Sequence, residues 1–336
     1  MIVREGVSLS SLTTFRVGGP VRYTIECSTV EEVTDAVAFA KEQGLPWRVL
    51  GEGSNVLASD EGFEGVLLLM RIPGVEQVVH GGMLTVTAGS GVSWDALVHV
   101  ACSKGAWGLE NLAGIPGTVG AAPVQNIGAY GAEVKDTLSE VHVLDAQTGE
   151  QKTFSNKECD FAYRSSRFKR EPWLVILSVS FKLPLNGVPS LTYKDFSVAK
   201  ATGQDLSTPA SIATVVRSIR ANKFPDLATH GTAGSFFKNP TISAEAFARL
   251  QEQYPELPGF PTADGIKIPI AYILDHVLHT RGYKEGAVGF FENHSLILVA
   301  EKNATENELN TFAKKFEARI KEVSNIDIER EVQTFP

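Results

Sequence analysis

Apolar residues along the first half of the chain repeat with strand and helix periods in turn, which predicts alternating strands and helices. The spacing of Ser28 and Glu31 is that of a capping box, so a helix is predicted from there to about Gln43, where Gly44 ends it. A second helix is predicted from apolar residues that share one helical face, namely Trp94, Leu97, Val98 and Ala101. Strands are predicted at residues 22–27, 47–50, 141–145 and 174–181. This mixture is typical of an α+β fold.

The pattern changes after Leu183. Residues 184–209 form an excursion that contains Pro, Ser and Thr around the sequence LTYKDF. Beyond it, helices are predicted at residues 209–221, 243–253 and 270–279, and a further one from about residue 305. We therefore place a domain border near residues 183–210.

The last forty residues carry two regular patterns. Thr305 and Glu308 form a second capping box, which opens a helix with one apolar face made of Leu309, Phe312, Phe316 and Ile320. Residues 326–335 then alternate as a strand does. The apolar Ile326, Ile328 and Val332 face one way and the acidic Asp327, Glu329 and Glu331 face the other.

Composition limits the function classes. A chain of 336 residues is expected to form two or three domains, and its formal charge of −8 argues against a nucleic-acid surface. No apolar run is long enough to span a bilayer, and the first residues have no secretory signal pattern. The three scattered cysteines predict reduced thiols in a cytoplasmic protein, and the histidines show no metal-ligand spacing, so no metal site is expected.

Two glycine-rich loops carry the first chemical signal. The sequences GEGSNVL (51–57) and GIPGTVGAAPVQNIGAYG (114–131) are rich in small residues, and the first directly follows a predicted strand. Backbone N–H groups can converge on an anion in such loops, which favours a pyrophosphate cradle, although tight turns in an α+β fold would give the same pattern. Two loops together favour a dinucleotide. Neither loop has the spacing of a Rossmann fingerprint or of a P-loop.

With these loops, the chain resembles the family of UDP-N-acetylenolpyruvoylglucosamine reductases (MurB). The matching motifs run in order along nearly the whole chain: TTFRVGG, the two glycine loops, FAYRSSRF, LTYKDF, KFPD, GTAGSFFKNP and IEREV. Each motif alone is weak, but the series is specific, and LTYKDF within its excursion points to the longer, type I form. The resemblance implies an FAD-binding domain of the vanillyl-alcohol-oxidase/para-cresol-methylhydroxylase (VAO/PCMH) type, built from two α+β subdomains, and a C-terminal α+β substrate-binding domain.

The resemblance also implies an expected division of the chain. Residues 1–183 would bind FAD and divide into subdomains near 65–75, residues 184–209 would carry Tyr193 on a lid, and residues 210–325 would bind substrate. Residues 326–336 would form the strand that carries Glu331.

As the resemblance implies, NADPH reduces FAD, and the reduced flavin then reduces the enolpyruvyl group of a UDP-sugar to give UDP-N-acetylmuramate, a peptidoglycan precursor. The partners are therefore small molecules, and the expected state is a monomer in the bacterial cytoplasm. FAD is expected to be non-covalent, because the first loop contains no histidine. Its expected contacts are Gly51, Gly53, Ser54, Asn55, Gly114, Ile115, Pro116, Gly117, Gly120, Gln125, Asn126, Gly128, Ala129 and Tyr130.

Ser235, in GTAGSFFKNP, matches the family's proton donor. A hydrolase nucleophile would instead need a catalytic triad and a G-x-S-x-G elbow, and the local pattern is not an elbow. Arg164 matches the active-site arginine, whose fixed cation can bind the substrate carboxylate and the enolate charge. Glu331 matches the C-terminal glutamate, with the role of a general acid or polarising group, and Glu329 is its neighbour in register.

Substrate contacts are expected from Tyr163, Tyr193, Lys223, Asn239 and His294, with Tyr193 folding over the pyrophosphate and Lys223 offering a cation to phosphate. Two other functions remain open from the residues. One is a sugar or alcohol oxidase on the same FAD fold, and the other is a non-catalytic protein that binds a nucleotide sugar.

Overall fold

The computed structural model describes residues 1–335, which form two compact units. The first unit comprises residues Met1–Val7, Val21–Glu52 and Glu64–Ala221. The second comprises Ser8–Pro20, Gly53–Phe63 and the chain from Asn222 on. Two N-terminal segments thus belong to the C-terminal unit, and the chain enters that unit for the last time after Ala221, beyond the border placed near 183–210.

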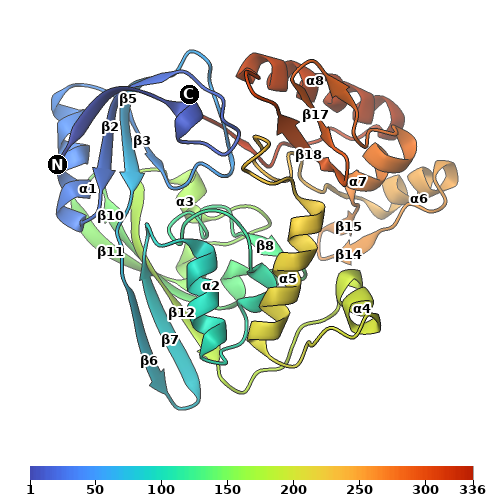
Figure 1. Ribbon diagram of the computed structural model, residues 1–336, viewed down its shortest axis with the longest axis horizontal. Coiled ribbons are helices and arrows are strands. Elements are labelled where there is room, and N and C mark those ends of the chain that lie inside the picture. Colours follow the sequence, from blue (N-terminus) through green and yellow to red (C-terminus); the bar gives the residue numbers. More distant parts are fainter. Residues whose placement is uncertain (336) are drawn as a thin grey trace. The chain divides into compact units, whose positions relative to one another are not determined.

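The first unit contains a four-stranded sheet in the order β1-β2-β5-β3 (Figure 1). Its strands are β1 (Val3–Ser8), β2 (Pro20–Cys27), β3 (Trp47–Leu50) and β5 (Phe63–Met70). Helix α1 (Val30–Glu42) connects β2 to β3 and buries Val33, Ala36, Val37 and Ala40 in the core beside this sheet. β3 pairs with β5 in parallel, and the two strands are joined by residues 51–62, a connection that contains β4 (Val56–Ala58).

A five-stranded antiparallel sheet, in the order β11-β10-β12-β7-β6, forms the rest of this unit's framework. Its strands are β6 (Val75–His80), β7 (Met83–Gly89), β10 (Leu138–Asp145), β11 (Glu150–Ser155) and β12 (Leu174–Pro184). β12 contributes residues to two cores, and a register shift in its pairing with β10 at Leu177 interrupts the strict alternation of faces. Val179 and Phe181 pack with the helices α2 (Trp94–Ser103) and α5 (Pro209–Lys223), whereas Val175 and Leu177 pack with α1.

Shorter elements lie between these. They are β8 (Gly128–Ala129), β9 (Ala132–Glu133), α3 (Arg167–Arg170), α4 (Lys194–Ala201), and 3-10 turns at Glu110–Leu112, Val134–Asp136 and Asn156–Cys159; a further 3-10 turn at Leu9–Ser11 belongs to the second unit. The second glycine loop has no regular structure before β8, and the excursion at 184–209 contains α4.

The second unit has three small sheets around one core. Its strands are β4 (Val56–Ala58), β13 (Thr241–Ile242), β14 (Phe260–Thr262), β15 (Gly265–Lys267), β16 (Lys284–Glu285), β17 (Val288–Phe291), β18 (His294–Ala300) and β19 (Gln333–Phe335). Its helices are α6 (Ala244–Gln253), α7 (Ile270–Tyr272), which continues as a π-turn over Ile273–Val277, and α8 (Glu306–Ser324). Within this unit, α8 packs on β17, with Phe312 and Phe316 both against Phe290.

Three local predictions need correction or refinement. The first helix is capped by Thr29, not Ser28: Thr29 Oγ1 accepts from the Glu32 N–H at 3.2 Å, and Glu32 accepts from the Ser28 N–H. The capping box at Thr305 and Glu308 is confirmed. The prediction of a continuous last strand is wrong, because within residues 326–335 strand pairing is confined to Arg330 and to Gln333–Phe335. The helix predicted at 270–279 is short and ends in the wider π-turn.

Candidate active site

The first two residues of the first glycine loop, Gly51 and Glu52, meet the second glycine loop in the first unit. The carboxylate of Glu52 accepts a hydrogen bond from the Gly117 N–H at 2.9 Å, and Arg71 donates to the Gly51 carbonyl at 3.1 Å. A Cβ on Gly51 would lie 2.7 Å from Thr118 Oγ1, so no other residue fits there without movement. Segments more than sixty residues apart thus form one structure. Sequence reasoning expected both loops but did not single out Glu52, although it lies inside GEGSN.

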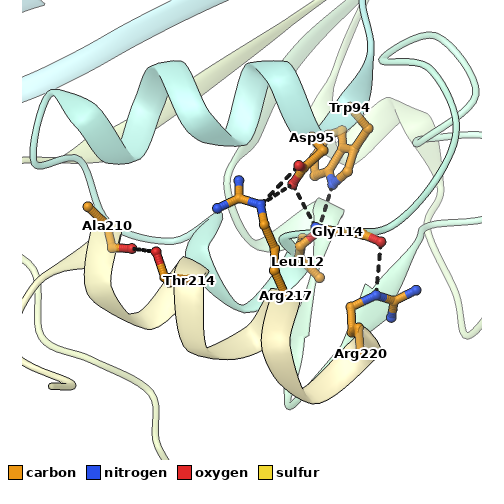
Figure 2. A network of polar contacts seen from close by, with 8 residues as sticks. All are labelled: Trp94, Asp95, Leu112, Gly114, Ala210, Thr214, Arg217 and Arg220. Carbon is orange, nitrogen blue, oxygen red and sulfur yellow. Dashed lines mark hydrogen bonds and ion pairs between the residues drawn. The ribbon is translucent and has the colours of Figure 1, made fainter. Parts of the chain in front are cut away.

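The second loop begins in a polar network that Figure 2 shows. Gly114 donates its N–H to Asp95 at 2.6 Å and accepts from Arg220 Nε at 2.9 Å. Arg217 holds Asp95 from the other side, with Nε 2.9 Å from Oδ2 (Figure 2). Gly114 has φ +69°, which favours glycine. Helices α2 and α5 therefore fix the first residue of the loop through both of its main-chain polar groups.

The charged groups of this network shift one another's pKa values. Burial alone would raise the pKa of Asp95, but the hydrogen bonds from Arg217 and from the Gly114 N–H outweigh it and hold the pKa below its usual value. Burial lowers the pKa of Arg220. Sequence reasoning missed all three side chains. The available signal was an aspartate in the first turn of an otherwise apolar helix, which is also where any helix favours an acid.

Further along, the loop approaches the turn after β7. Gly120 donates its N–H to the Ser90 carbonyl at 3.0 Å, and a Cβ on Gly120 would lie 2.5 Å from Ser90 Cβ. Ser90 Oγ is buried and has no hydrogen-bond partner in the part of the chain that the structure describes. Such a group is costly unless something satisfies it.

Asn126 holds the end of the loop together. It is fully buried, its Nδ2 donates to Glu133 Oε2 and to the Ala162 carbonyl, and its Oδ1 accepts from the Lys135 N–H. The side-chain amide is thus used within the protein, so any contribution to cofactor binding acts through the shape of the loop.

Arg164 lies on this same loop end. It occupies a two-residue turn between Ala162 and Ser165, with φ +53°, and its Nη2 donates to the Gly128 carbonyl at 2.9 Å. Its guanidinium carbon is 5.3 Å from the ring centroid of Tyr163. A Cβ on Gly128 would lie 3.2 Å from Arg164 Nη1. The structure therefore brings two predicted site residues, Tyr163 and Arg164, to the predicted cofactor loop.

Tyr193 also contacts this loop end. Its ring, 48% exposed, lies 5.4 Å from that of Tyr130 in an edge-on contact. Asn111 Nδ2 donates both to the Tyr130 carbonyl and to the Ser190 carbonyl, at 3.0 and 2.9 Å. Burial raises the pKa of Tyr130 to about 12, so its phenol is neutral. The excursion is therefore tied to the second glycine loop.

Ser235 lies in the second unit, on an extended segment between β18 and the C-terminal residues. Ser235 pairs with Ile297, and the Phe236 N–H donates to the Leu296 carbonyl at 2.8 Å. Phe236 is fully buried, as is Phe237. The serine itself is partly exposed. A partly exposed hydroxyl on a rigid, doubly paired backbone can present a proton at a fixed point.

Glu331 lies on the other edge of that segment. Its N–H donates to the Phe236 carbonyl at 2.8 Å, and its carbonyl accepts from Asn55 Nδ2 at 3.3 Å. The Gln333 N–H donates to the Asn55 carbonyl, so β4 and β19 continue this contact as a parallel pair. Three residues predicted in separate motifs, Asn55, Ser235 and Glu331, therefore belong to one hydrogen-bonded structure.

The remaining substrate candidates of the second unit are Asn239, His294 and Lys223. Asn239 Oδ1 accepts from the Ile270 N–H at 3.1 Å. His294 begins β18, and its Nδ1 accepts from the Leu296 N–H, next to the residue that pairs with Ser235. Lys223 ends α5. Among residues 1–335 there is no group of three or more potential ligands that could hold a metal ion, and no helix is long and apolar enough to cross a membrane.

Comparison with known proteins assigns the family. Residues 21–155 match the model of an FAD-binding domain, and residues 226–335 match the C-terminal domain of UDP-N-acetylenolpyruvoylglucosamine reductase. The UDP-N-acetylenolpyruvoylglucosamine reductases of Bdellovibrio bacteriovorus and Pseudomonas syringae pv. tomato are each 38% identical to the chain. Both alignments cover 98% of this chain, and they cover 99% and 98% of the two reductases, respectively. The chain belongs to this family.

A solved structure agrees with this assignment. The reductase (MurB) of Thermus caldophilus matches all of the chain and is itself matched in full, with a TM-score of 0.69 and 25% identity. The predicted family resemblance and the α+β fold with an FAD-binding domain are therefore confirmed. The oxidase alternative is not favoured.

The residues of the glycine loops fit FAD. A Cβ at Gly51 or Gly120 would overlap the side chain of Thr118 or Ser90, so both positions favour glycine, and the buried Ser90 hydroxyl beside Gly120 has no partner in the described part of the chain, which suits a polar ligand such as a pyrophosphate. Neither loop contains a histidine for covalent attachment. Which loop atoms contact the cofactor stays a prediction, as do the roles of the individual site residues.

Proposed function

We propose that the chain catalyses reduction of the enolpyruvyl group of UDP-N-acetyl-3-O-(1-carboxyvinyl)glucosamine to UDP-N-acetylmuramate, with NADPH as the source of hydride. FAD supplies the hydride carrier between the two substrates. The observation that carries the proposal is the pairing of the Ser235 segment with β18 on one edge and with Glu331 on the other. Family membership supports the choice of reaction.

The residues of the chain have three tasks in this reaction. Hydride addition to the terminal carbon leaves negative charge next to the substrate carboxylate. Arg164 offers a fixed cation for that carboxylate and for the enolate oxygen. Ser235 donates its hydroxyl proton to the adjacent carbon, and Glu331 polarises the enol or acts as a second acid. The intermediate carbon is far more basic than an ordinary amine, so a weak acid held in place is sufficient.

The division of work follows the two units. The two glycine loops at 51–57 and 114–131 hold FAD, and Tyr193 on the excursion of the first unit covers the pyrophosphate of the substrate. In the second, Lys223 and Asn239 bind the phosphate end, and His294 is a further polar contact. We further propose that NADPH and the UDP-sugar use one site in turn, that the enzyme is a monomer of the longer, type I form, and that it works in the bacterial cytoplasm.

Anaerobic kinetics test the proposal. NADPH should bleach the flavin of the wild type, and the enolpyruvyl UDP-sugar should restore its colour. In Ser235→Ala, bleaching should persist, whereas reoxidation by the UDP-sugar should slow by about 10²-fold, the low end for a lost general acid. Ser218→Ala, an exposed serine of α5, is the matched control and should behave as wild type.

Two outcomes would contradict the proposal. If both half-reactions slowed equally in Ser235→Ala, the serine would serve binding or structure. If oxygen and a sugar alcohol, but not the UDP-sugar, turned the flavin over, the oxidase function would be correct. A colourless protein that cannot be reconstituted with FAD would exclude both.

A further inference from the structure

Arg330 directly precedes Glu331 and pairs with the segment that carries Ser235, but it is not one of the predicted site residues. Its main chain bridges to Phe237, while the neighbouring Glu329 and Glu331 bond to Lys238 and Phe236. The Lys238 N–H donates to the Glu329 carbonyl at 2.9 Å, and the Glu331 N–H donates to the Phe236 carbonyl at 2.8 Å. These contacts set the register of the two segments, and Arg330 is at their centre.

The side chain of Arg330 adds three more contacts. Nε donates to Glu317 Oε1 at 2.5 Å, and Nη1 donates to Asn310 Oδ1 at 2.7 Å. The guanidinium carbon lies 5.5 Å from the ring centroid of Phe236. The side chains of Arg330 and Glu317 are only 22% and 27% exposed, so this pair is better shielded than a surface ion pair. Charge-assisted hydrogen bonds of this kind also fix the orientation of the guanidinium group.

Both acceptors belong to α8, and this helix is itself held in place at its N-terminus and along its buried face. Its first turn is closed by the capping box of Thr305, and the carboxylate of Asp60 accepts the N–H groups of Glu306 and Asn307. Its apolar face is buried in the core of the second unit. A side chain fixed to α8 at two points therefore has little freedom to shift.

We propose that Arg330 is a positioning residue that holds Ser235 and Glu331 in register, which rests on the function proposed above. It anchors the C-terminal segment to α8 and covers Phe236, the residue between Ser235 and the main-chain bond to Glu331. Loss of these contacts lets the two segments shift relative to each other. Small shifts of a reacting group slow catalysis strongly, because the proton must be delivered from one direction.

The first measurement is kinetic and uses the FAD-loaded enzyme. Arg330→Met keeps much of the apolar stem but removes every donor. We expect flavin reduction by NADPH to stay within about twofold of wild type, the affinity for the UDP-sugar to be unchanged, and its reduction to slow by about tenfold. Arg330→Lys, which keeps one cation, should recover part of the rate. Lys321→Met removes an exposed ion pair from the same helix to Asp327 in the same segment and is the control.

The second measurement does not depend on activity. Hydrogen exchange of the apoprotein should rise in Arg330→Met within residues 231–238 and 329–335, but not in the interior of α8. Equal slowing of both half-reactions, or unchanged exchange in these peptides, would overturn the proposal. If Arg330→Met does not fold, Glu317→Gln replaces it. This variant should show the same changes in UDP-sugar reduction and in hydrogen exchange, but smaller ones. Wild-type kinetics and exchange in Glu317→Gln would overturn the proposal. Failure of the wild type to reduce the UDP-sugar would refute the proposed function alone, since the exchange data would still decide the role of Arg330.

Discussion

The junction of the two glycine loops permits a sharp test of the cofactor cradle, through Gly51→Ala. The new Cβ would meet Thr118 Oγ1 at 2.7 Å and Thr118 Cγ2 at 3.4 Å, whereas Thr118 Cβ would be at 3.6 Å. Ordinary contacts begin at about 3.5 Å between carbons, so the loops must separate by several tenths of an ångström. Forced overpacking of this kind costs about 2 kcal/mol. Thermal unfolding of the apoprotein should therefore shift down by about 4–8 °C.

The structure also names the substitution that repairs the damage. Thr118→Ala removes both atoms that the introduced methyl group would overlap and leaves only the ordinary contact to Cβ. The double variant Gly51→Ala/Thr118→Ala should therefore be more stable than Gly51→Ala alone, with an interaction free energy of about 1–2 kcal/mol.

Two assays check this reasoning. Calorimetry of the four apoproteins gives the stability cycle, and FAD fluorescence quenching gives the affinity, which should fall in Gly51→Ala and recover in the double variant. Strictly additive stabilities would refute the steric explanation. Recovered stability without recovered FAD binding would show that the junction does not shape the cofactor site.

Two further predictions concern titratable groups. Asp95 has a lowered pKa in the folded state, so its stabilising effect is present above the unfolded pKa of about 3.9 and is lost as the pH falls through the folded value. Asp95→Asn should thus unfold at lower urea than wild type at pH 7, and the difference should shrink at pH 3. Burial raises the pKa of the thiols of Cys27, Cys102 and Cys159 to about 12, so iodoacetamide at pH 8 should label them only after unfolding, as mass spectrometry can count.

Much of the local structure could be predicted because its causes are local. The capping box of α8 joins residues three apart, and its apolar face repeats within the helix, so Thr305 and Phe312 reveal it directly. The shift of the first cap from Ser28 to Thr29 shows the limit of such signals. Both residues have suitable side chains and acids nearby, and only the backbone decides which hydroxyl accepts the Glu32 N–H.

The prediction of a continuous strand over residues 326–335 was wrong for a different reason. Alternation over residues 326–335 indicates a half-buried surface, but it does not say how many neighbours supply backbone partners. Arg330 pairs with Phe237 on one segment, and Gln333 onward pairs with β4 on another. The chain changes partner between these points, which interrupts regular pairing, and nothing in the alternation marks the change.

The site itself depends on contacts between distant parts of the chain. Asn55 and Glu331 are 276 positions apart, and the Thr14 hydroxyl that donates to the Thr232 carbonyl lies 218 positions before it. The motifs could be recognised in order because each is a short local sequence. Their assembly could not, because a backbone carbonyl such as that of Glu331 accepts a hydrogen bond whatever its side chain. The residues that set the geometry, such as Arg330 and Asp95, act on neighbours of the motif residues, so they carry no motif of their own and only the structure identifies them.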